Sequence, residues 1–164
     1  MVEPRFDRRE WDHWQPTERA VLCFIVRAGR ILLIHKKRGL GAGKINGPGG
    51  RIENGETPLA AVIRETEEEI GVTPVRPEPV GELSFQFADG FGIHVTVFIA
   101  SEYEGELRET AEAAPFWADV REIPYAAMWA DDECWLPQLI AGKKVRGRFT
   151  FNGDKMLGQH VEVI

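Results

Sequence analysis

Hydrophobic residues occur along this chain in short runs separated by turn-forming residues. The runs at residues 20–26 and 31–35 flank Ala28 and Gly29, which predicts two strands joined by a tight turn. The next stretch, residues 36–50, is rich in glycine and predicts a loop. The first third of the chain is therefore expected to form a strand pair followed by a long loop.

Helices and strands are both expected in the remainder of the chain. Residues 58–70 predict a helix, because Pro58 suits a first turn and Gly71 suits a stop. A second helix is expected near residues 132–141, although Pro137 must then lie in its first turn or bend it. Strands are expected at residues 80–87, 92–100 and 115–120, and a closing hairpin begins near residue 149 and continues beyond residue 156. This order predicts an α/β fold in which a mixed β-sheet is sandwiched between α-helices.

The composition is that of one globular domain. At 164 residues, with 43% hydrophobic and 28% charged residues, the chain can bury a single core. We expect residues 1–19, which are polar with scattered aromatics, to form an N-terminal arm, and residues 20–164 to form the domain. The longest apolar run, residues 20–26, is too short to cross a bilayer, and the N-terminus lacks the apolar stretch of a signal peptide. We expect a cytoplasmic protein without a membrane segment, and a monomer.

Charge and cysteine content narrow the ligands that the protein could bind. The formal net charge is −6, so no basic surface for duplex nucleic acid is expected. Cys23 lies within an apolar run, and Cys23 and Cys134 lack metal-ligand spacing, so neither a disulfide nor a cysteine-bound metal is expected. Phosphate groups would have to be met by bound metal and a few local basic residues.

Acidic residues are dense in the predicted helix at residues 58–70. At about 100° per residue, Glu65, Glu68 and Glu69 fall within one arc of its surface, whereas Glu67 points away. Like charges at this spacing repel one another, so a cation is expected to offset the cost. Mg²⁺ prefers oxygen ligands and leaves positions open for water and phosphates. The spacing therefore predicts a magnesium site, with Mn²⁺ as an alternative ion.

The surroundings of this acidic helix make the prediction more specific. Arg64 lies one turn before Glu68 and can orient it, while Glu56 at the start of the helix can compete for the same guanidinium. Taken alone, an acidic helix is most simply a solvent-exposed surface. The full pattern is Gly50, five residues, Glu56, seven residues, then Arg-Glu-x-x-Glu-Glu-x-Gly over residues 64–71.

This pattern resembles the signature of the Nudix hydrolases at every charged and glycine position. One residue departs from it: Thr66 stands where the family more often has an aliphatic residue, and we expect it to face the sheet rather than the metal. The similarity extends to the mammalian MutT homologues of that family through residues 36–39, 41–47, 85–87, 94–98, 128–135 and 147–151. It covers the chain from about residue 20 onward. The resemblance implies a Nudix fold and Mg²⁺-dependent hydrolysis of oxidised purine nucleoside triphosphates, such as 8-oxo-dGTP and 2-oxo-dATP, to monophosphate and pyrophosphate. Such an activity clears the nucleotide pool and so serves DNA repair.

A purine base needs a flat apolar wall and polar groups at its edge, and Asn46, Trp129, Asp131 and Asp132 offer both. A carboxylate can accept from two guanine N–H donors, and two adjacent carboxylates in an apolar pocket favour sharing one proton, so that one of them can donate. The resemblance implies the same roles for these four residues. Taken singly, each has a simpler explanation: a turn at Asn46, a helix cap at the aspartates, a core position for Trp129. For Phe85, Phe87 and Trp135 the choice between pocket and core stays open.

The resemblance also implies the catalytic and metal-binding sets. The catalytic residues would be Arg64, Glu65, Glu68 and Glu69, and the metal would be held by Glu65, Glu68, Glu69, the Gly49 carbonyl and Glu112 of a later loop. Lys36 would contact a phosphate. Leu40, Ile45 and Pro48 replace aromatic residues of the mammalian proteins near the pocket, which leaves the preferred oxidised purine open.

Two other functions fit the same motif. The chain could hydrolyse another diphosphate, such as a nucleotide sugar, ADP-ribose or a dinucleoside polyphosphate. It could also be an inactive Nudix domain that only binds a ligand, although an inactive fold has no need for crowded carboxylates at residues 65, 68 and 69.

Overall fold

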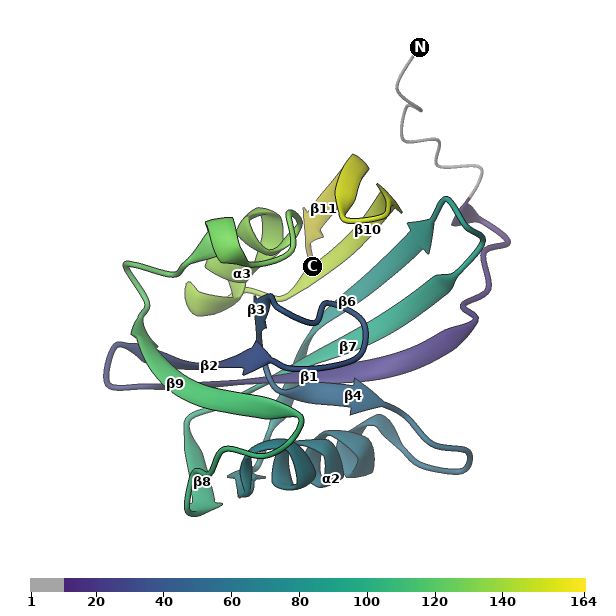
Figure 1. Cartoon of the computed structure of the whole chain (residues 1–164). Helices are drawn as coiled ribbons and strands as arrows, with labels where there is room; N and C mark the ends of the chain where they lie inside the picture. The colour runs from purple at the N-terminus through teal and green to yellow at the C-terminus, as the bar shows by residue number, and fades with distance from the viewer. Residues whose placement is uncertain (1–10) are drawn as a thin grey trace.

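The computed structural model describes residues 11–164, which form a nine-stranded mixed sheet with helices packed on it. Its strands are β1 (Glu18–Arg27), β2 (Arg30–Lys36), β3 (Ile45–Asn46), β4 (Gly49–Arg51), β6 (Glu78–Phe87), β7 (Gly92–Ala100), β9 (Ala113–Asp119), β10 (Val145–Asn152) and β11 (Lys155–Val163). They follow the order β11-β10-β6-β7-β1-β2-β3, with β4 paired to β1 and β9 paired to β2 (Figure 1). The β1–β7 and β6–β10 pairs are parallel and the others antiparallel, so the predicted mixed sheet is confirmed.

Helices cover both faces of this sheet, with α2 (Pro58–Ile70) on one and α3 (Asp132–Ile140) on the other (Figure 1). The central strand β1 contributes to two cores, because successive side chains of a strand point to opposite faces. Val21 and Cys23 pack in the core that includes Val62 of α2. Phe24 packs against Trp135 of α3, with ring centroids 5.9 Å apart. Burial on both faces explains why the sequence of β1 is almost continuously apolar.

The bounds of α2 agree with the predicted helix at residues 58–70, and its caps explain them. Thr57 precedes the helix and its Oγ1 accepts a hydrogen bond from the Ala60 N–H at 3.1 Å, while Pro58 occupies the first turn. Gly71 follows the helix with φ of +81°, a left-handed conformation that favours glycine. The helix therefore begins and ends where its local sequence specifies.

Two residues singled out in the sequence are buried between α2 and the sheet. Thr66 is fully buried and its hydroxyl donates to the Val62 carbonyl at 2.7 Å, so it faces the sheet, as expected. Cys23 is also fully buried, and burial raises the pKa of its thiol to about 12. Both Cys23 and Cys134 are free thiols.

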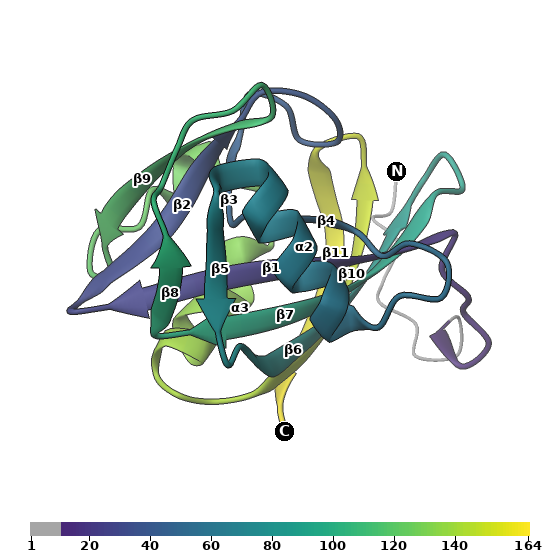
Figure 2. The same ribbon diagram turned by 90° about the horizontal axis from the view of Figure 1, so that it is seen from below.

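Several short elements were not predicted. β3 and most of β4 fall in the stretch, residues 36–50, that was expected to be a loop. β5 (Val72–Val75) pairs with β8 (Glu102–Gly105) in a separate two-stranded sheet beside α2 (Figure 2). A 3₁₀ helix, η1 (Tyr125–Ala127), precedes α3. Pro137 lies inside α3, beyond its first turn, and the helix ends at Ile140, three residues later. The predicted closing hairpin is confirmed as β10–β11, although it begins earlier, at Val145.

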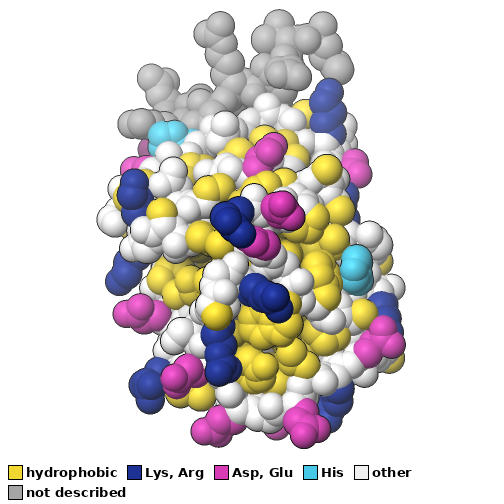
Figure 3. Space-filling view, turned by 90° about the vertical axis from the view of Figure 1, so that its left-hand side faces the viewer, with side chains coloured by type: hydrophobic (Ala, Val, Ile, Leu, Met, Phe, Trp, Pro, Cys, Tyr) yellow, Lys and Arg dark blue, Asp and Glu magenta, His cyan; other side chains and the backbone are white. Residues whose placement is uncertain are grey.

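The surface shown in Figure 3 carries basic and acidic side chains interspersed around hydrophobic areas, rather than gathered by sign. No helix within residues 11–164 is both long enough and apolar enough to span a membrane. Residues 1–10 of the predicted N-terminal arm lie outside the described residues. The rest of that arm runs into β1, which begins at Glu18, so the boundary at residue 20 stays a prediction.

Candidate functional site

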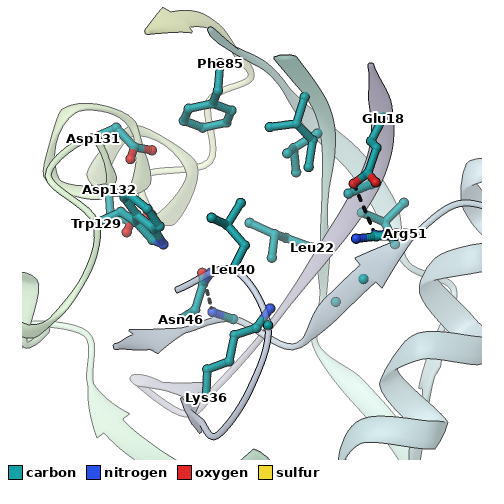
Figure 4. Close-up of a pocket in the computed structure, with 18 of the residues that line it drawn as sticks. Glu18, Leu22, Lys36, Leu40, Asn46, Arg51, Phe85, Trp129, Asp131 and Asp132 are labelled. Carbon is teal, nitrogen blue, oxygen red and sulfur yellow. Dashed lines mark hydrogen bonds and ion pairs between the residues drawn. The ribbon is translucent and has the colours of Figure 1, made fainter. Parts of the chain in front are cut away.

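A pocket opens on the α3 side of the sheet, and it collects the side chains that the sequence assigned to substrate. All six predicted substrate-binding residues line it: Lys36, Asn46, Phe85, Trp129, Asp131 and Asp132 (Figure 4). They come from β2, β3, β6 and the segment that leads into α3, so segments far apart in sequence meet here. Gly49 and Gly50 of β4 also line the pocket, next to the acidic residues of α2.

The carboxylates on the α2 side form a compact group. Ligand oxygens of Glu65, Glu69 and Glu112 all lie within 4.8 Å of one another. Glu68 lies outside this group, although it was expected to face the same place, and its carboxylate accepts instead from Arg64 Nη1 at 3.2 Å. Three carboxylate oxygens at this separation suit a divalent cation that prefers oxygen ligands.

Glu69 is the most buried member of this group. Its side chain accepts a hydrogen bond from the Gly49 N–H at 3.3 Å, and the residue is 3% exposed. Burial raises the pKa of Glu69 to about 7, against the opposing effects of the Gly49 N–H and the Lys36 charge. Burial likewise raises the pKa of Glu65, although Arg64 opposes the shift. A bound cation would lower these pKa values again, because it stabilises the ionised carboxylates.

Arg64 holds the acidic face of α2 in place. Its guanidinium bonds both oxygens of Glu56, Nε to Oε2 at 2.7 Å and Nη2 to Oε1 at 2.9 Å. Nη1 donates to Glu65 Oε1 at 2.8 Å as well as to Glu68. The hydrogen bonds from Arg64 lower the pKa of Glu56 to about 2, so this pair stays ionised at neutral pH. The expected competition between Glu56 and Glu68 for Arg64 is therefore resolved by simultaneous binding.

Glu112 is brought to the group by a hydroxyl that the sequence analysis did not single out. Thr110 Oγ1 donates to the Glu69 carbonyl at 2.7 Å and accepts from the Glu112 N–H at 3.2 Å. The loop carrying Glu112 is thereby tied to the end of α2. Arg38 Nη2 also contacts Glu112 Oε1 at 3.1 Å. A Thr two residues before an acidic residue is the local signal for such a turn, but the sequence alone does not show where that turn docks.

The glycines of β4 form a thin partition between the pocket and the carboxylates. A Cβ atom on Gly50 would lie 2.3 Å from the Glu65 carboxyl, and one on Gly49 would lie 2.0 Å from the Val21 carbonyl oxygen. Gly49 therefore requires glycine, because a side chain there would collide with the backbone of β1, whereas a side chain at Gly50 would displace the Glu65 carboxyl. The Gly49 carbonyl, expected as a metal ligand, belongs to this partition.

The substitution Gly50→Ala is expected to displace the Glu65 carboxyl and to weaken divalent-cation binding by about tenfold or more, since positions that support a ligand typically contribute that much. Titration of the purified variant with Mn²⁺ or Mg²⁺ by calorimetry measures the effect. Unchanged cation affinity would show that Glu65 does not contribute to the ligand set.

The end of the pocket next to α3, here called the base end after the ligand that the sequence predicts, is lined by Trp129, Asp131 and Asp132 and contains two buried carboxyl groups. Asp131 and Asp132 are each 3% exposed, and Trp135 Nε1 donates to Asp131 Oδ2 at 2.8 Å. Asp132 Oδ2 has no hydrogen-bond partner among residues 11–164. Burial raises the pKa of Asp131 to about 6, and burial together with the neighbouring Asp131 raises that of Asp132 well above its usual range. Because burial disfavours two adjacent charges, the pair favours sharing one proton, so that one carboxyl can donate while the other accepts.

The simpler explanation of this aspartate pair as a helix cap is not supported. Asp131 occupies the N-cap position of α3, but its side chain makes no capping hydrogen bond. Trp135 is fully buried in the core, and its indole N–H orients Asp131. An unsatisfied buried oxygen is uncommon in native proteins, and this one belongs to a residue that lines the pocket, where a ligand or a water can supply its partner.

The remaining pocket residues provide a wall and a polar edge. The Trp129 ring lies edge-on to Phe87, with centroids 6.1 Å apart, and Lys44 Nζ lies 5.2 Å from its centroid. Phe85 serves both pocket and core, because it lines the pocket and stacks on Phe149 at 5.2 Å. Asn46 Oδ1 accepts from the Gly47 N–H at 2.8 Å, which fixes the amide at the end of β3 (Figure 4).

Lys36 and Leu40 occupy the mouth of the pocket. Lys36 lies at the end of β2 and faces Glu69 closely enough to affect its pKa. Leu40 is 50% exposed on the glycine-rich loop that leads from β2 to β3. Lys36 is therefore placed between the base end of the pocket and the carboxylates, where a phosphate chain would pass.

Comparison with known proteins identifies relatives of this site. A sequence profile described as the NUDIX domain matches residues 16–139. The oxidized purine nucleoside triphosphate hydrolase of zebrafish (Danio rerio) is 41% identical over 85% of this chain and 90% of its own, and that of mouse (Mus musculus) is 38% identical over 79% and 84%. The crystal structure of a mutator MutT protein from Bacillus halodurans superposes with a TM-score of 0.78 at 29% identity, covering 88% of this chain and 97% of that one.

Proposed function

Because the chain belongs to the Nudix family, we propose that it hydrolyses oxidised purine nucleoside triphosphates, with Mg²⁺ as cofactor, to the monophosphate and pyrophosphate. The observation that carries this proposal is the unsatisfied Oδ2 of Asp132, beside Asp131, in a pocket that adjoins the carboxylates Glu65 and Glu69. One end of the pocket can hydrogen-bond a base edge, and the other can bind the cations of a phosphate chain.

The donor set fits a divalent cation. We propose that Glu65, Glu69 and Glu112 bind it, with Glu68 and the Gly49 carbonyl as further ligands. Mg²⁺, when bound, neutralises the phosphate charge and lowers the pKa of water. The protein's part is to hold the carboxylates at close range: Arg64 clamps Glu65 and Glu68, the Gly49 N–H orients Glu69, and Thr110 positions the Glu112 loop.

The same pocket would orient the nucleotide for hydrolysis. Trp129 and Phe85 provide apolar surface for the base, Asn46 and the aspartate pair its polar edge, and Lys36 a charge for a phosphate. A base fixed in this way places the phosphate chain over the Gly49–Gly50 partition. Orientation of this kind lowers the barrier because the reacting atoms are held at close range.

Hydrolysis of 8-oxo-dGTP, 2-oxo-dATP, dGTP and ADP-ribose side by side in Mg²⁺ tests the substrate assignment. The oxidised purine triphosphates are expected to give the highest kcat/KM. Preferential cleavage of ADP-ribose would transfer the assignment to another Nudix substrate class, and cleavage of none would favour a binding module. The monomeric state and cytoplasmic location expected from the sequence stay predictions, which sizing chromatography and cell fractionation test.

Reaction in ¹⁸O-labelled water identifies the bond that breaks. Water attack on the β-phosphorus cleaves its bond to the bridging oxygen next to the α-phosphorus, so the label is expected in pyrophosphate and not in the monophosphate. Mass spectrometry of the two products measures this. Orthophosphate as the main first product would contradict the proposed orientation of the chain.

A further inference from the structure

The residues that precede β1 contact the β6–β7 hairpin, and phenylalanines of this hairpin line the pocket. Residues 11–17, here called the N-terminal segment, lie beside the far end of the β6–β7 hairpin (Figure 1). Most of this segment precedes residue 16, where the NUDIX profile begins, so its contacts are features of this chain rather than of the profile. Two of its residues, Trp14 and Thr17, contact the hairpin directly.

Trp14 reaches the hairpin through one side chain, Gln86. The Trp14 indole N–H donates to Gln86 Oε1 at 2.8 Å. The amide nitrogen of Gln86 donates in turn to the carbonyls of Phe87, at 2.9 Å, and Phe91, at 3.2 Å. Gln86 therefore links the two sides of the hairpin at its end. Trp14 donates to the side-chain oxygen of Gln86 and so fixes the orientation of the Gln86 amide.

The backbone of the hairpin is held at the same place. Thr17 N–H donates to the Gly92 carbonyl at 2.8 Å, and the Gly92 N–H donates to Thr17 Oγ1 at 3.2 Å. A Cβ atom on Gly92 would lie 3.2 Å from the Trp14 ring and 3.1 Å from Gln86 Oε1. Trp11 adds to the support, because it is 8% exposed and its ring lies 5.2 Å from that of Trp14.

The residues held in this way form one wall of the pocket. Phe85 and Phe87, which flank Gln86 on β6, line the pocket together with Phe91. Phe87 packs on Phe91 at 5.9 Å and on Trp129 at 6.1 Å between ring centroids. Since neighbouring residues of a strand point to opposite faces, Trp14 can fix the position of this wall without entering the pocket.

We propose that Trp14 is a positioning residue for the base wall of the pocket, acting through Gln86 on Phe87 and Phe91. The proposal rests on the proposed function in that the ligand of this wall is a purine base. Trp14 belongs neither to the carboxylate group nor to the residues that line the pocket. Its loss should therefore weaken nucleotide binding and leave the hydrolytic step unaffected.

The test compares full-length wild-type protein with Trp14→Phe, Gln86→Met and the double variant. Trp14→Phe keeps the aromatic packing and removes the indole donor. It is expected to raise KM for the nucleotide that wild-type protein hydrolyses best by about 3–10-fold, with kcat changed by less than about twofold. Because the two residues act through one hydrogen bond, the double variant should be no worse than the more impaired single variant. Gln15→Ala, at an exposed position of the same segment, is the matched control.

Amide hydrogen exchange gives a second measurement that does not depend on activity. In Trp14→Phe the amides of residues 87–92 are expected to exchange faster, while those of α2 keep their wild-type rates. A fall in kcat on every nucleotide at unchanged KM would overturn the proposal, because it would show a merely structural role. Failure of wild-type protein to prefer oxidised purines would instead overturn the substrate assignment, while KM and exchange would still report on Trp14.

Discussion

Substitution of Glu69 by glutamine is expected to lower Mg²⁺-dependent turnover by about 10²–10³-fold or more, while the metal-free protein unfolds at an equal or higher temperature. The reason is that the change removes a ligand from the carboxylate group and also removes a buried charge. Steady-state kinetics with varied Mg²⁺ and thermal unfolding in EDTA measure the two effects.

The gain in stability should depend on pH in a defined direction. Burial raises the pKa of Glu69 from 4.5 to about 7 in the folded protein. Between these pH values Glu69 is ionised in the unfolded chain and protonated in the folded protein. Its contribution therefore lowers the free energy of unfolding as the pH rises, and this loss is complete above about pH 7. It amounts to about 3 kcal/mol at most. The metal-free variant should therefore exceed wild type at pH 8 and match it at pH 4.

Glu67→Gln is the matched control, because this exposed residue of the same helix lies outside the carboxylate group. It should leave turnover and Mg²⁺ dependence unchanged. Glu68→Gln is also expected to reduce turnover, and the size of its loss shows whether Glu68 leaves Arg64 to join the metal. Near-normal Mg²⁺-dependent turnover of the Glu69 variant would mean that α2 does not form the metal site.

Substitution of either buried aspartate by asparagine is expected to lower kcat/KM on oxidised purines about tenfold or more, because each buried group left unpaired costs roughly 1–3 kcal/mol. Asp131→Asn should give the larger loss. It replaces an acceptor by an amide whose N–H groups would face the donors of the base, whereas the amide of Asp132→Asn still offers a donor. The ranking of 8-oxo-dGTP against 2-oxo-dATP is expected to change with these substitutions.

Glu133→Gln provides the control for this pair, since Glu133 is the exposed residue that follows them on α3. Mg²⁺ affinity should stay unchanged in all three variants, because the aspartates line the base end of the pocket and lie outside the carboxylate group. Equal, small effects on every nucleotide would remove the pair from base recognition and return the substrate to an unspecified nucleoside diphosphate derivative.

The helix and longer strands could be predicted from the sequence because their signals are local. Thr57, Pro58 and Gly71 specify the ends of α2 within a few residues, and the apolar run of β1 reflects burial on both faces. The short strands β3, β4, β5 and β8 have no such signal, because two to four residues are too few to show an alternating pattern. These segments become strands because a neighbouring strand pairs with them, and the partner is known only once the whole fold is known.

The site was predictable to the extent that its residues share one motif or one resemblance. Glu65 and Glu69 follow from helical spacing, but the same spacing placed Glu68 with them and could not show that its exposed carboxylate lies outside the group. The hydrogen bond from Trp14 to Gln86 joins residues 72 positions apart, so no local sequence pattern predicts it. Contacts of this kind depend on which surfaces the completed sheet brings together.

The residues proposed to bind the base come from the α3 side of the sheet and the carboxylates from its α2 side, and the β4 glycines adjoin both groups. This arrangement allows the nucleotide preference to change independently of the metal-binding carboxylates. On the proposed function, substitutions around Trp129, Asp131 and Asp132 should change which nucleotide is preferred without moving the carboxylates. Gly49 has no such freedom, because a side chain there would collide with the β1 backbone, and a side chain at Gly50 would displace the carboxyl of Glu65.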